Sequence, residues 1–471
     1  MIRDSWIVAA LLPAVCLTTP THGSVTADSC KASCGEAVSA HHAGAASDAV
    51  VDEATLERFA GAMLPMMPKE EQEKIVAGGG LGAASFEANV HGLTEYSGEG
   101  SLEEWLDASL EKITDNPMTD RQIEVLYSIA DAVESGVVMP ELCFAPDTPG
   151  EYVWLVRELL TVTAPPNPNA FQQRNRWTRT TLSGAGLGQG DPTIITYSFV
   201  PDGTFIPNSG EGTGNSQLFA WLNSIYGDAG TWQAIFAQVF DRWAELTGTS
   251  YVYEPNDDGT SHRDFDGVAG VRGDVRIAAM VLDGNSGLLA YNFYPDFGGD
   301  MVFDAFDSFY NGTFGDSLGL RNVIAHEHGH GLGMGHVCPV FETKLMEPFV
   351  SFAFDGPQLD DILNGHRHSA AAATDLGSMS VNETLEMDLV SIDDPDDVDF
   401  YKISLDVPSL ITFTVTPDAD SYRQGPQTLN CDEDDASSVL TNYNLVHDLR
   451  LNVYTSDDLV NPIFTSLSGF P

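Results

Sequence analysis

Three patterns of apolar and polar positions follow one another along the 471-residue chain. Apolar residues recur at helical spacing in three stretches, 52–63, 102–113 and 121–134. Capping boxes begin the second and third stretches, Ser101 with Glu104 and Thr119 with Gln122. These signals predict a helical region over residues 24–165.

The last part of the chain, residues 374–471, changes to short alternating stretches separated by acidic turns. The stretches typical of β-strands are 401–405, 410–415 and 449–453. A Pro- and Asn-rich segment, 163–173, and a run of alanine, 370–373, are predicted linkers. The pattern therefore divides the chain into a helical region, a middle domain over 174–369 and a small β-domain.

The first 23 residues have the pattern of an export signal. A single Arg3 precedes the apolar run 6–12, which is too short to span a bilayer, and small or polar residues follow. No later stretch contains 18 consecutive apolar residues. We therefore expect a secreted, extracellular protein without a membrane span.

Composition sets limits on the partners. The chain contains 21 Lys and Arg against 69 Asp and Glu, so the formal net charge is 21 − 69 = −48. Such a surface repels nucleic acid and anionic membranes, while it favours solubility and divalent cations.

The densest group of chemistry-bearing residues lies between His326 and His336. A helix over 318–330 places His326 and His330 one turn apart, so both imidazoles can share one ion. Gly333 tolerates a left-handed backbone, which would end the helix and bring His336 to the same ion. Three histidines with one open position are the arrangement of a catalytic zinc, whereas a structural zinc has four protein ligands.

Glu327 lies beside the ligand face, where it can reach a water on the metal without being a ligand. Three uncharged ligands leave the charge of the ion unneutralised, so bound water would lose its proton near pH ~7. Glu327 would accept that proton and pass it to the leaving amine. A short His-Glu-x-x-His match arises by chance, but a third histidine after a glycine makes chance a poor explanation. His328 points off the ligand face, and we expect it at the surface or behind the ligands.

Five positions resemble the long zinc signature of the metzincin peptidases: His326, Glu327, His330, Gly333 and His336. Further on, the sequence Lys-Leu-Met-Glu-Pro is similar to the Met-turn of that clan. The resemblance implies that Met346 lies beneath the zinc.

Within this clan, the matrixin catalytic domain resembles the chain from about Trp177 to about Arg367. Similar segments occur in the family's order at 193–199, 239–246, 274–278, 289–295 and 358–362. The resemblance implies an α+β, zincin-like domain with three helices and a twisted, mostly parallel mixed sheet. A substrate would lie antiparallel to the edge strand near 289–293, and residues 337–352 would line the main pocket.

The resemblance also bears on other metals. Acidic residues match the family's calcium sites at four positions, Asp274, Asp300, Asp304 and Asp307. Carboxylates on loops suit calcium, although in so acidic a chain they can equally be solvated side chains. The histidines of the family's structural zinc would fall at Tyr291 and Val302, so no structural zinc is expected.

Cys143 begins the sequence Cys-Phe-Ala-Pro-Asp, which resembles the matrixin propeptide motif whose cysteine caps the catalytic zinc. The arginine that precedes this cysteine in the family is Leu142 here. The alternative is a buried cysteine or a disulfide, for example with Cys338. Residues 24–165 are thus predicted to be a propeptide, and Cys143 a possible cysteine switch.

Residues 374–471 resemble the bacterial pre-peptidase C-terminal domain, a small β-sandwich, which looks incomplete here. Together these features predict a secreted zinc-dependent metalloendopeptidase, made as a zymogen, that hydrolyses protein or peptide substrates. The alternative is a non-catalytic extracellular binding or adhesion module that retains a metal site. Glu327 favours the enzyme, because a binding module has no use for a carboxylate beside an open zinc. The sequence does not predict an oligomeric state.

Overall fold

The computed structural model describes residues 7–13, 93–113, 117–162, 174–188, 191–262, 266–337 and 344–358, and shorter stretches from there to residue 467. They belong to one compact unit, Met1–Ala14 with Ile75–Pro471. The predicted helix at 52–63, the linker at 163–173 and most of the predicted last helix at 358–362 lie outside the described residues.

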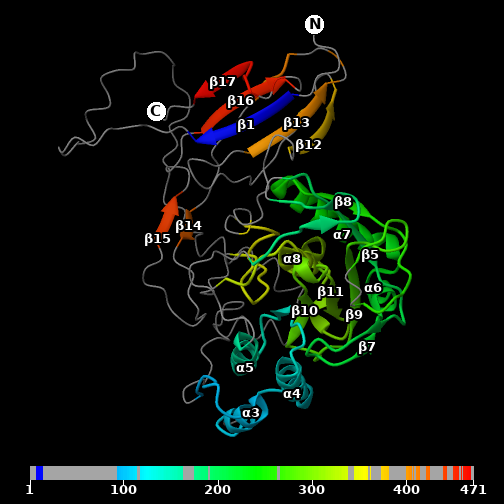
Figure 1. The fold of residues 1–471 in the computed structure, drawn as a ribbon, viewed down its shortest axis with the longest axis vertical. Coiled ribbons are helices and arrows are strands. Elements are labelled where there is room, and N and C mark those ends of the chain that lie inside the picture. The colour runs from blue at the N-terminus through cyan, green and yellow to red at the C-terminus, as the bar shows by residue number, and fades with distance from the viewer. Residues whose placement is uncertain are drawn as a thin grey trace, which may run out of the picture. The chain divides into compact units, whose positions relative to one another are not determined.

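A six-stranded sheet forms the middle of the chain, with the order β2-β10-β11-β9-β5-β8 (Figure 1). Its strands are β2 (Glu141–Phe144), β5 (Ile194–Phe199), β8 (Ser250–Tyr253), β9 (Val275–Met280), β10 (Leu288–Asn292) and β11 (Met301–Asp304). Strands β8, β5, β9 and β11 run parallel, whereas β10 is antiparallel to β11. The expected mixed, mostly parallel sheet is confirmed. Strand β2, antiparallel to β10, was not predicted.

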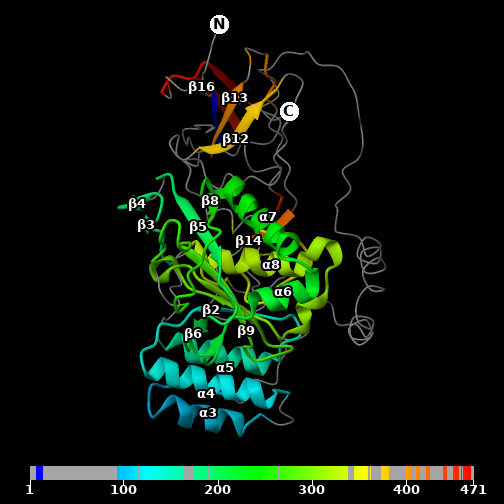
Figure 2. The ribbon, with the colours of Figure 1, turned by 90° about the vertical axis from the view of Figure 1, so that its right-hand side faces the viewer.

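Three helices and one apolar core cover one face of this sheet (Figure 2). They are α6 (Leu218–Tyr226), α7 (Ala229–Thr247) and α8 (Phe314–Gly331). Helix α7 begins at Asp228, whose carboxylate accepts from the Thr231 amide, and ends at the left-handed Gly248. Among the described residues, no helix is long and apolar enough to cross a membrane.

The other face of the sheet is covered by α3 (Leu102–Leu110), α4 (Asp120–Glu134) and α5 (Gly150–Thr161). Figure 2 shows α5, α4 and α3 stacked in that order away from the sheet. Both predicted capping boxes are present, while α5 was not predicted. Tyr291 and Val302 lie opposite each other in register and are buried in this second core. The helical region therefore shares a core with the sheet instead of forming its own.

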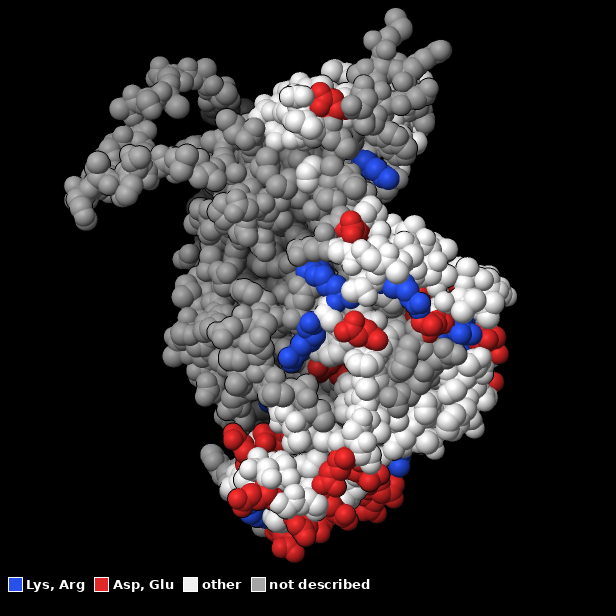
Figure 3. Space-filling view, viewed as in Figure 1, with Lys and Arg blue, Asp and Glu red and all other residues white. Residues whose placement is uncertain are grey.

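Acidic side chains gather at the end of the molecule formed by α3 and α4 (Figure 3). Exposed members are Glu103, Glu104, Asp107, Glu111, Asp120 and Glu124. Neither helix carries a basic residue in its last turn. Part of the negative charge seen in the composition is thus concentrated here.

Shorter elements complete the middle region. They are the strand pairs β3 (Arg179–Thr180) with β4 (Gly184–Ala185) and β6 (Phe205–Ile206) with β7 (Gly214–Asn215), and the 3-10 helices η3 (Pro295–Phe297) and η4 (Ser308–Asn311). They connect the longer elements at the surface of the domain.

A separate five-stranded sheet has the order β12-β13-β1-β16-β17. Its strands are β12 (Thr374–Met379), β13 (Asp399–Leu405), β1 (Ile7–Pro13), β16 (Leu449–Thr455) and β17 (Phe464–Leu467), and β14 (Ser421–Gln424) pairs separately with β15 (Val439–Asn442). The strands predicted at 401–405 and 449–453 are confirmed. The strand predicted at 410–415 is wrong over its described residues, 410–413, where the chain is irregular and Leu410 is 98% exposed. The predicted, incomplete β-sandwich over residues 374–471 stays a prediction.

The middle strand of this sheet, β1, comes from the predicted export signal and pairs with β13 and β16. A short apolar run without charges suits a strand flanked on both sides. Removal of the first 23 residues would take this strand out of the sheet.

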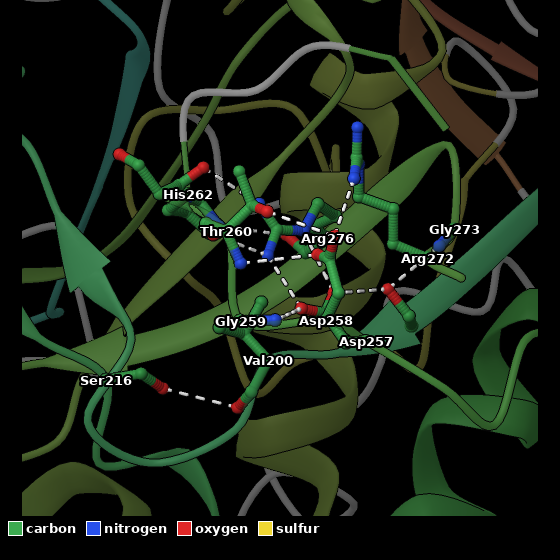
Figure 4. Close-up of polar contacts among 12 residues, drawn as sticks. Val200, Ser216, Asp257, Asp258, Gly259, Thr260, His262, Arg272, Gly273 and Arg276 are labelled. Atoms are coloured by element: carbon green, nitrogen blue, oxygen red, sulfur yellow. Dashed lines mark hydrogen bonds and ion pairs between the residues drawn. The ribbon is translucent and has the colours of Figure 1, made fainter. Parts of the chain in front are cut away.

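An arginine on β9 holds the loop that follows β8 (Figure 4). The Arg276 guanidinium donates to both carboxylate oxygens of Asp257, at 2.6 and 2.9 Å. It also donates to the carbonyls of Thr260 and Ser261, at 2.8 and 3.0 Å. Both side chains of the ion pair are 1% exposed. Its four hydrogen bonds compensate for burial of the charge.

We expect Arg276→Leu to destabilise the protein by about 3–5 kcal/mol, because Asp257 would remain as a buried charge without its partner. The midpoint of urea unfolding of the full-length chain measures the loss. Arg179→Leu is the matched control, since Arg179 and Asp266 form a pair at 56% and 63% exposure. Exposed pairs contribute at most about 1 kcal/mol. Equal losses in the two variants would contradict a structural role for the buried pair.

Candidate metal centre

Helix α8 carries the predicted ligands through the middle of the protein. Its backbone is non-helical at Gly315, Asp316 and Ser317, and every residue from Ser317 to Gly331 is buried. Asn322 fastens the helix to the following segment by donating to the carbonyls of Ser351 and Phe354, both at 2.8 Å. The ligand helix is therefore held on all sides, which fixes the positions of its histidines.

The chain reverses at Gly333, as the sequence predicted. Its φ is +100°, and an added Cβ would lie 1.9 Å from the carbonyl oxygen of Asn175. Both the backbone conformation and the lack of space therefore require glycine. The Gly333 carbonyl also accepts from the Arg174 amide at 2.7 Å, which holds the reversal in place.

The three predicted ligands, His326, His330 and His336, come together after this reversal. Their Nε2 atoms lie 3.0 Å (326 to 330), 3.1 Å (326 to 336) and 3.2 Å (330 to 336) apart. Zinc bound tetrahedrally at about 2.0–2.1 Å separates its ligand nitrogens by roughly 3.3 Å. The spacing therefore fits three ligands of one small cation.

The outer ring nitrogens show which protonation state these histidines have. His326 Nδ1 lies 2.7 Å from the Leu345 carbonyl, and His330 Nδ1 lies 2.7 Å from the Met334 carbonyl. Because a carbonyl only accepts, both Nδ1 atoms carry hydrogen and both Nε2 atoms present lone pairs in a neutral ring. Burial lowers the pKa of His326 well below its usual value and that of His330 to about 3. Lone pairs that face each other at this distance repel unless a cation lies between them.

Glu327 lies next to this group and is fully buried. Within the described residues, neither carboxylate oxygen forms a hydrogen bond of acceptable geometry. Burial raises the pKa of Glu327 well above its usual value, and the nearby Cys143 thiol offsets this only in part. A buried carboxylate with free acceptor capacity beside three imidazoles suits a group that accepts and returns a proton.

Met346 packs against the ligand helix, while its place beneath a zinc stays a prediction. A Cβ added at Gly329 would lie 2.4 Å from its sulfur, so the thioether fills the space that this glycine leaves. Asp361, which we did not predict as a site residue, accepts from the amides of Leu345 and Met346 at 2.9 and 3.1 Å. This carboxylate fixes the turn whose carbonyl orients His326.

Strand β2 brings Cys143 into the same site. Its sulfur, the Nε2 or Nδ1 of His326 and a Glu327 carboxylate oxygen lie within 4.8 Å of one another. The thiol is buried and free. Burial raises its pKa well above the ordinary value, and the charge of Glu327 raises it further. The alternative partner Cys338 lies outside the described residues.

Two more side chains of the site were missed in the sequence. Glu141, on β2, approaches His336 Nδ1 at 3.2 Å with its Oε2 atom and accepts from the Tyr294 hydroxyl with Oε1. The histidine and the hydroxyl hold the pKa of Glu141 well below its usual range, although burial acts in the opposite direction. No motif announces either residue, because the contact depends on where β2 lies.

His328 was expected at the surface or behind the ligands, and the structure places it behind them. The residue is fully buried, with its ring in edge contact with Phe240 and Tyr251, and its Nε2 lies 2.8 Å from the Tyr251 hydroxyl. Helix α7 covers this side of α8, so a residue that points away from the ligand face of α8 points into the core between these two helices. It lies behind the ligands.

The aspartates predicted to bind calcium have protein partners. Asp274 accepts four hydrogen bonds, from the amides and hydroxyls of Thr181 and Thr196, at 2.7–2.9 Å. Asp300 accepts from the Arg276 amide at 2.8 Å. Among the described residues, neither aspartate belongs to a group of three close metal-ligating atoms. A calcium ion at this pair stays a prediction.

Asp304 and Asp307 lie with Asp283 in a buried acidic cluster. Asp304 accepts from the amides of Gly284 and Phe306, both at 2.8 Å. Burial raises the pKa of Asp283 to about 8 and that of Asp307 to about 7, and the neighbouring Asp304 charge adds to both. Asp307 Oδ2 has no hydrogen-bond partner within the described part of the chain. Without a cation, these two groups are protonated near neutral pH.

Comparison with known proteins agrees with the geometry of the histidines. Residues 228–362 match the family described as Matrixin, a span that includes α7, α8, the three histidines and Glu327. No curated protein matches the chain. The match supports a metallopeptidase, a hydrolase that acts on proteins, with a histidine cluster able to hold a metal.

The raised pKa values predict how stability depends on pH. Asp307 keeps its proton in the folded protein up to about pH 7, but loses it near 3.8 when unfolded. Its stabilisation is therefore complete below pH 3.8 and lost as the pH rises through about 7. We expect Asp307→Asn to reduce the fall in stability between pH 5 and 8, by up to about 1.4 kcal/mol per pH unit.

The measurement is the melting temperature of the full-length chain across that range in the presence of a chelator. Asp131→Asn, an exposed position on α4, is the control and leaves the profile unchanged. Added calcium would ionise the cluster and flatten the profile if it binds here. If neither calcium nor Asp307→Asn changed how the melting temperature depends on pH, the result would contradict both a calcium site here and the titration of Asp307.

Proposed function

We propose that the protein is a secreted, zinc-dependent metalloendopeptidase made as a zymogen. One observation carries the proposal: the Nε2 atoms of three imidazoles meet within 3.2 Å of each other, beside a buried carboxylate. A hydrolase needs both parts. A binding module needs only the first, so this alternative has no observation in its favour.

In the proposed reaction, zinc held by His326, His330 and His336 supplies positive charge that polarises a peptide carbonyl and acidifies water. Glu327 takes the proton from the attacking water and transfers it to the amine that leaves. Its burial beside the three histidines suits this task, because the carboxyl group must hold the proton between the two transfers. The surrounding core excludes bulk solvent from the carboxylate.

The walls of the cleft support an extended peptide as substrate. By the cleft we mean the space that residues 141–145 occupy between β10 and residues 348–350. Phe144 and Ala145 bond there to the carbonyls of Pro348 and Gly287 and to the amide of Val350, at 2.8–3.2 Å. The chain enters this cleft before Glu141 and leaves it after Ala145. A polypeptide can thus lie across the site with chain on both sides, which favours cleavage inside a protein over removal of end residues.

The same strand supports latency. While β2 pairs with β10, a substrate has no edge strand to join, and the Cys143 thiol lies against Glu327. Helices α4 and α5 share a core with the sheet, so their removal would expose Tyr291, Phe293 and Val302. Activation is therefore proposed to displace β2 while the helices stay. Export through residues 1–23 and calcium at the four aspartates belong to the proposal and rest on sequence alone.

A casein digestion assay tests the activity after limited proteolysis of the full-length, zinc-loaded protein. We expect Glu327→Ala to lower the rate by about 10²–10⁴-fold without loss of zinc, because the proton acceptor goes while the ligands stay. His330→Ala should lose metal and activity together, as should treatment with a chelator. Elemental analysis of each sample gives the zinc content.

Glu245→Ala is the matched control, since this exposed glutamate on α7 forms an ion pair with Arg242 of the same helix. It should keep full activity. Undiminished digestion by Glu327→Ala, or a processed protein that holds no zinc, would end the proposal.

A second measurement addresses latency. Cys143→Ser removes the thiol beside Glu327, and a hydroxyl is a much poorer zinc ligand than a thiolate. We expect the full-length variant to digest casein at least tenfold faster than the unprocessed parent. If the variant digested casein no faster than the unprocessed parent, Cys143 would be excluded as the cause of latency. The rest of β2 would then remain as the segment that blocks the site.

A further inference from the structure

Strand β2 runs antiparallel to β10, which is the direction predicted for a substrate. On its other side it runs parallel to the segment at Phe349. Phe144 donates its amide to Pro348 at 3.0 Å and accepts from Val350 at 3.2 Å. The strand therefore uses both walls, as the proposed peptide substrate would.

Side chains along β2 alternate between two environments. Leu142 and Phe144 belong to the core shared with α4 and α5, whereas Cys143 belongs to the core around α8. Glu141 faces the same side as Cys143 and reaches His336. Two side chains spaced two residues apart thus lie on either side of the metal ligands, and the peptide group between them crosses the site.

The third ligand differs from the other two in its outer nitrogen. His326 and His330 donate Nδ1–H to backbone carbonyls of their own domain. The Nδ1 atom of His336 instead lies 3.2 Å from a carboxylate oxygen of Glu141, which belongs to β2. Histidines that bind metals need such an acceptor to fix the ring, and a carboxylate serves this purpose well.

The surroundings of Glu141 favour a negative charge. Its second oxygen accepts from the Tyr294 hydroxyl, and the positive charge of Arg174 acts on both Tyr294 and His330. In a chain with a net charge of −48, Glu141 thus faces His336 and the Tyr294 hydroxyl, with the positive charge of Arg174 nearby. When β2 leaves, His336 and Tyr294 stay in place and lose the carboxylate.

We propose that His336 Nδ1 and the Tyr294 hydroxyl form an acid-accepting subsite of the cleft. Glu141 occupies it in the precursor, and an acidic side chain of the peptide substrate occupies it in the active protein. That acidic residue lies two positions before the residue facing Glu327, where the precursor has Cys143. The substrate part of this proposal rests on the proposed function, whereas the contact of Glu141 in the precursor does not.

The contact itself is tested without activity, in the full-length Glu327→Ala protein. Iodoacetamide modifies exposed thiols, and peptide mass spectrometry reports the rate at Cys143 alone. We expect Glu141→Gln and Tyr294→Phe each to raise this rate at least tenfold, because β2 loses a charge-assisted hydrogen bond and leaves the cleft more often. Glu111→Gln, an exposed glutamate at the end of α3, should leave the rate unchanged.

The melting temperature shows whether each variant folds, and Tyr294→Phe decides the matter if Glu141→Gln does not. Rates within twofold of the parent in the folded variants would overturn the subsite. These rates do not depend on hydrolysis, so they stand apart from the casein result.

Substrate preference is tested with the activated protein and peptides that carry Glu, Gln or Lys at the acid position. We expect KM for the Glu peptide to be at least tenfold lower than for the Gln peptide, with kcat changed less. Tyr294→Phe should reduce this difference. Cleavage of all three peptides with equal KM would refute the preference, whereas a lack of any cleavage would count against the proposed function instead.

Discussion

The site depends on the close approach of three imidazole rings, whose Nε2 atoms lie 3.0–3.2 Å apart and could hold one cation. His326 and His330 are neutral and fixed by carbonyls, so neither ring can turn away. His336 approaches them within 3.2 Å because the chain reverses at Gly333. The buried helix, the reversal and the turn at Met346 all serve to hold three like dipoles together. A cation bound at that point would replace the repulsion between the ring nitrogens with attraction to the ion.

Much of this centre could be predicted from sequence because its determinants are local. Helical spacing brings two histidines to one face, and a glycine allows the reversal. Strands β5, β9 and β10 lie in segments that were expected from the resemblance to matrixins, whereas their order in the sheet was not predicted. The partial family match over residues 228–362 covers the same part of the chain. The relative positions of these ligands depend on residues that are close in sequence, so one sequence is enough to predict them.

The remaining features depend on long-range packing. The sequence left His328 either at the surface or behind the ligands, because only the packing of α7 on that side of α8 decides between the two. Strand β2 is four residues long, too short for its period to be recognised, and it pairs with a partner more than a hundred residues away. Glu141 and Tyr294 meet only through that pairing. Helix α5 begins at Gly150 without a side-chain cap, so no start signal marked it.

The shared core connects latency to stability. A propeptide that folded alone could leave without cost, but α4 and α5 bury the face of the sheet that carries Tyr291 and Val302. Strand β2 buries Leu142 and Phe144 in the same core, so displacing it costs apolar burial as well as its hydrogen bonds. The helices bury many more apolar side chains, so their removal costs more than displacing the strand. A block on the site that consists of the strand alone can therefore be released without unfolding the sheet.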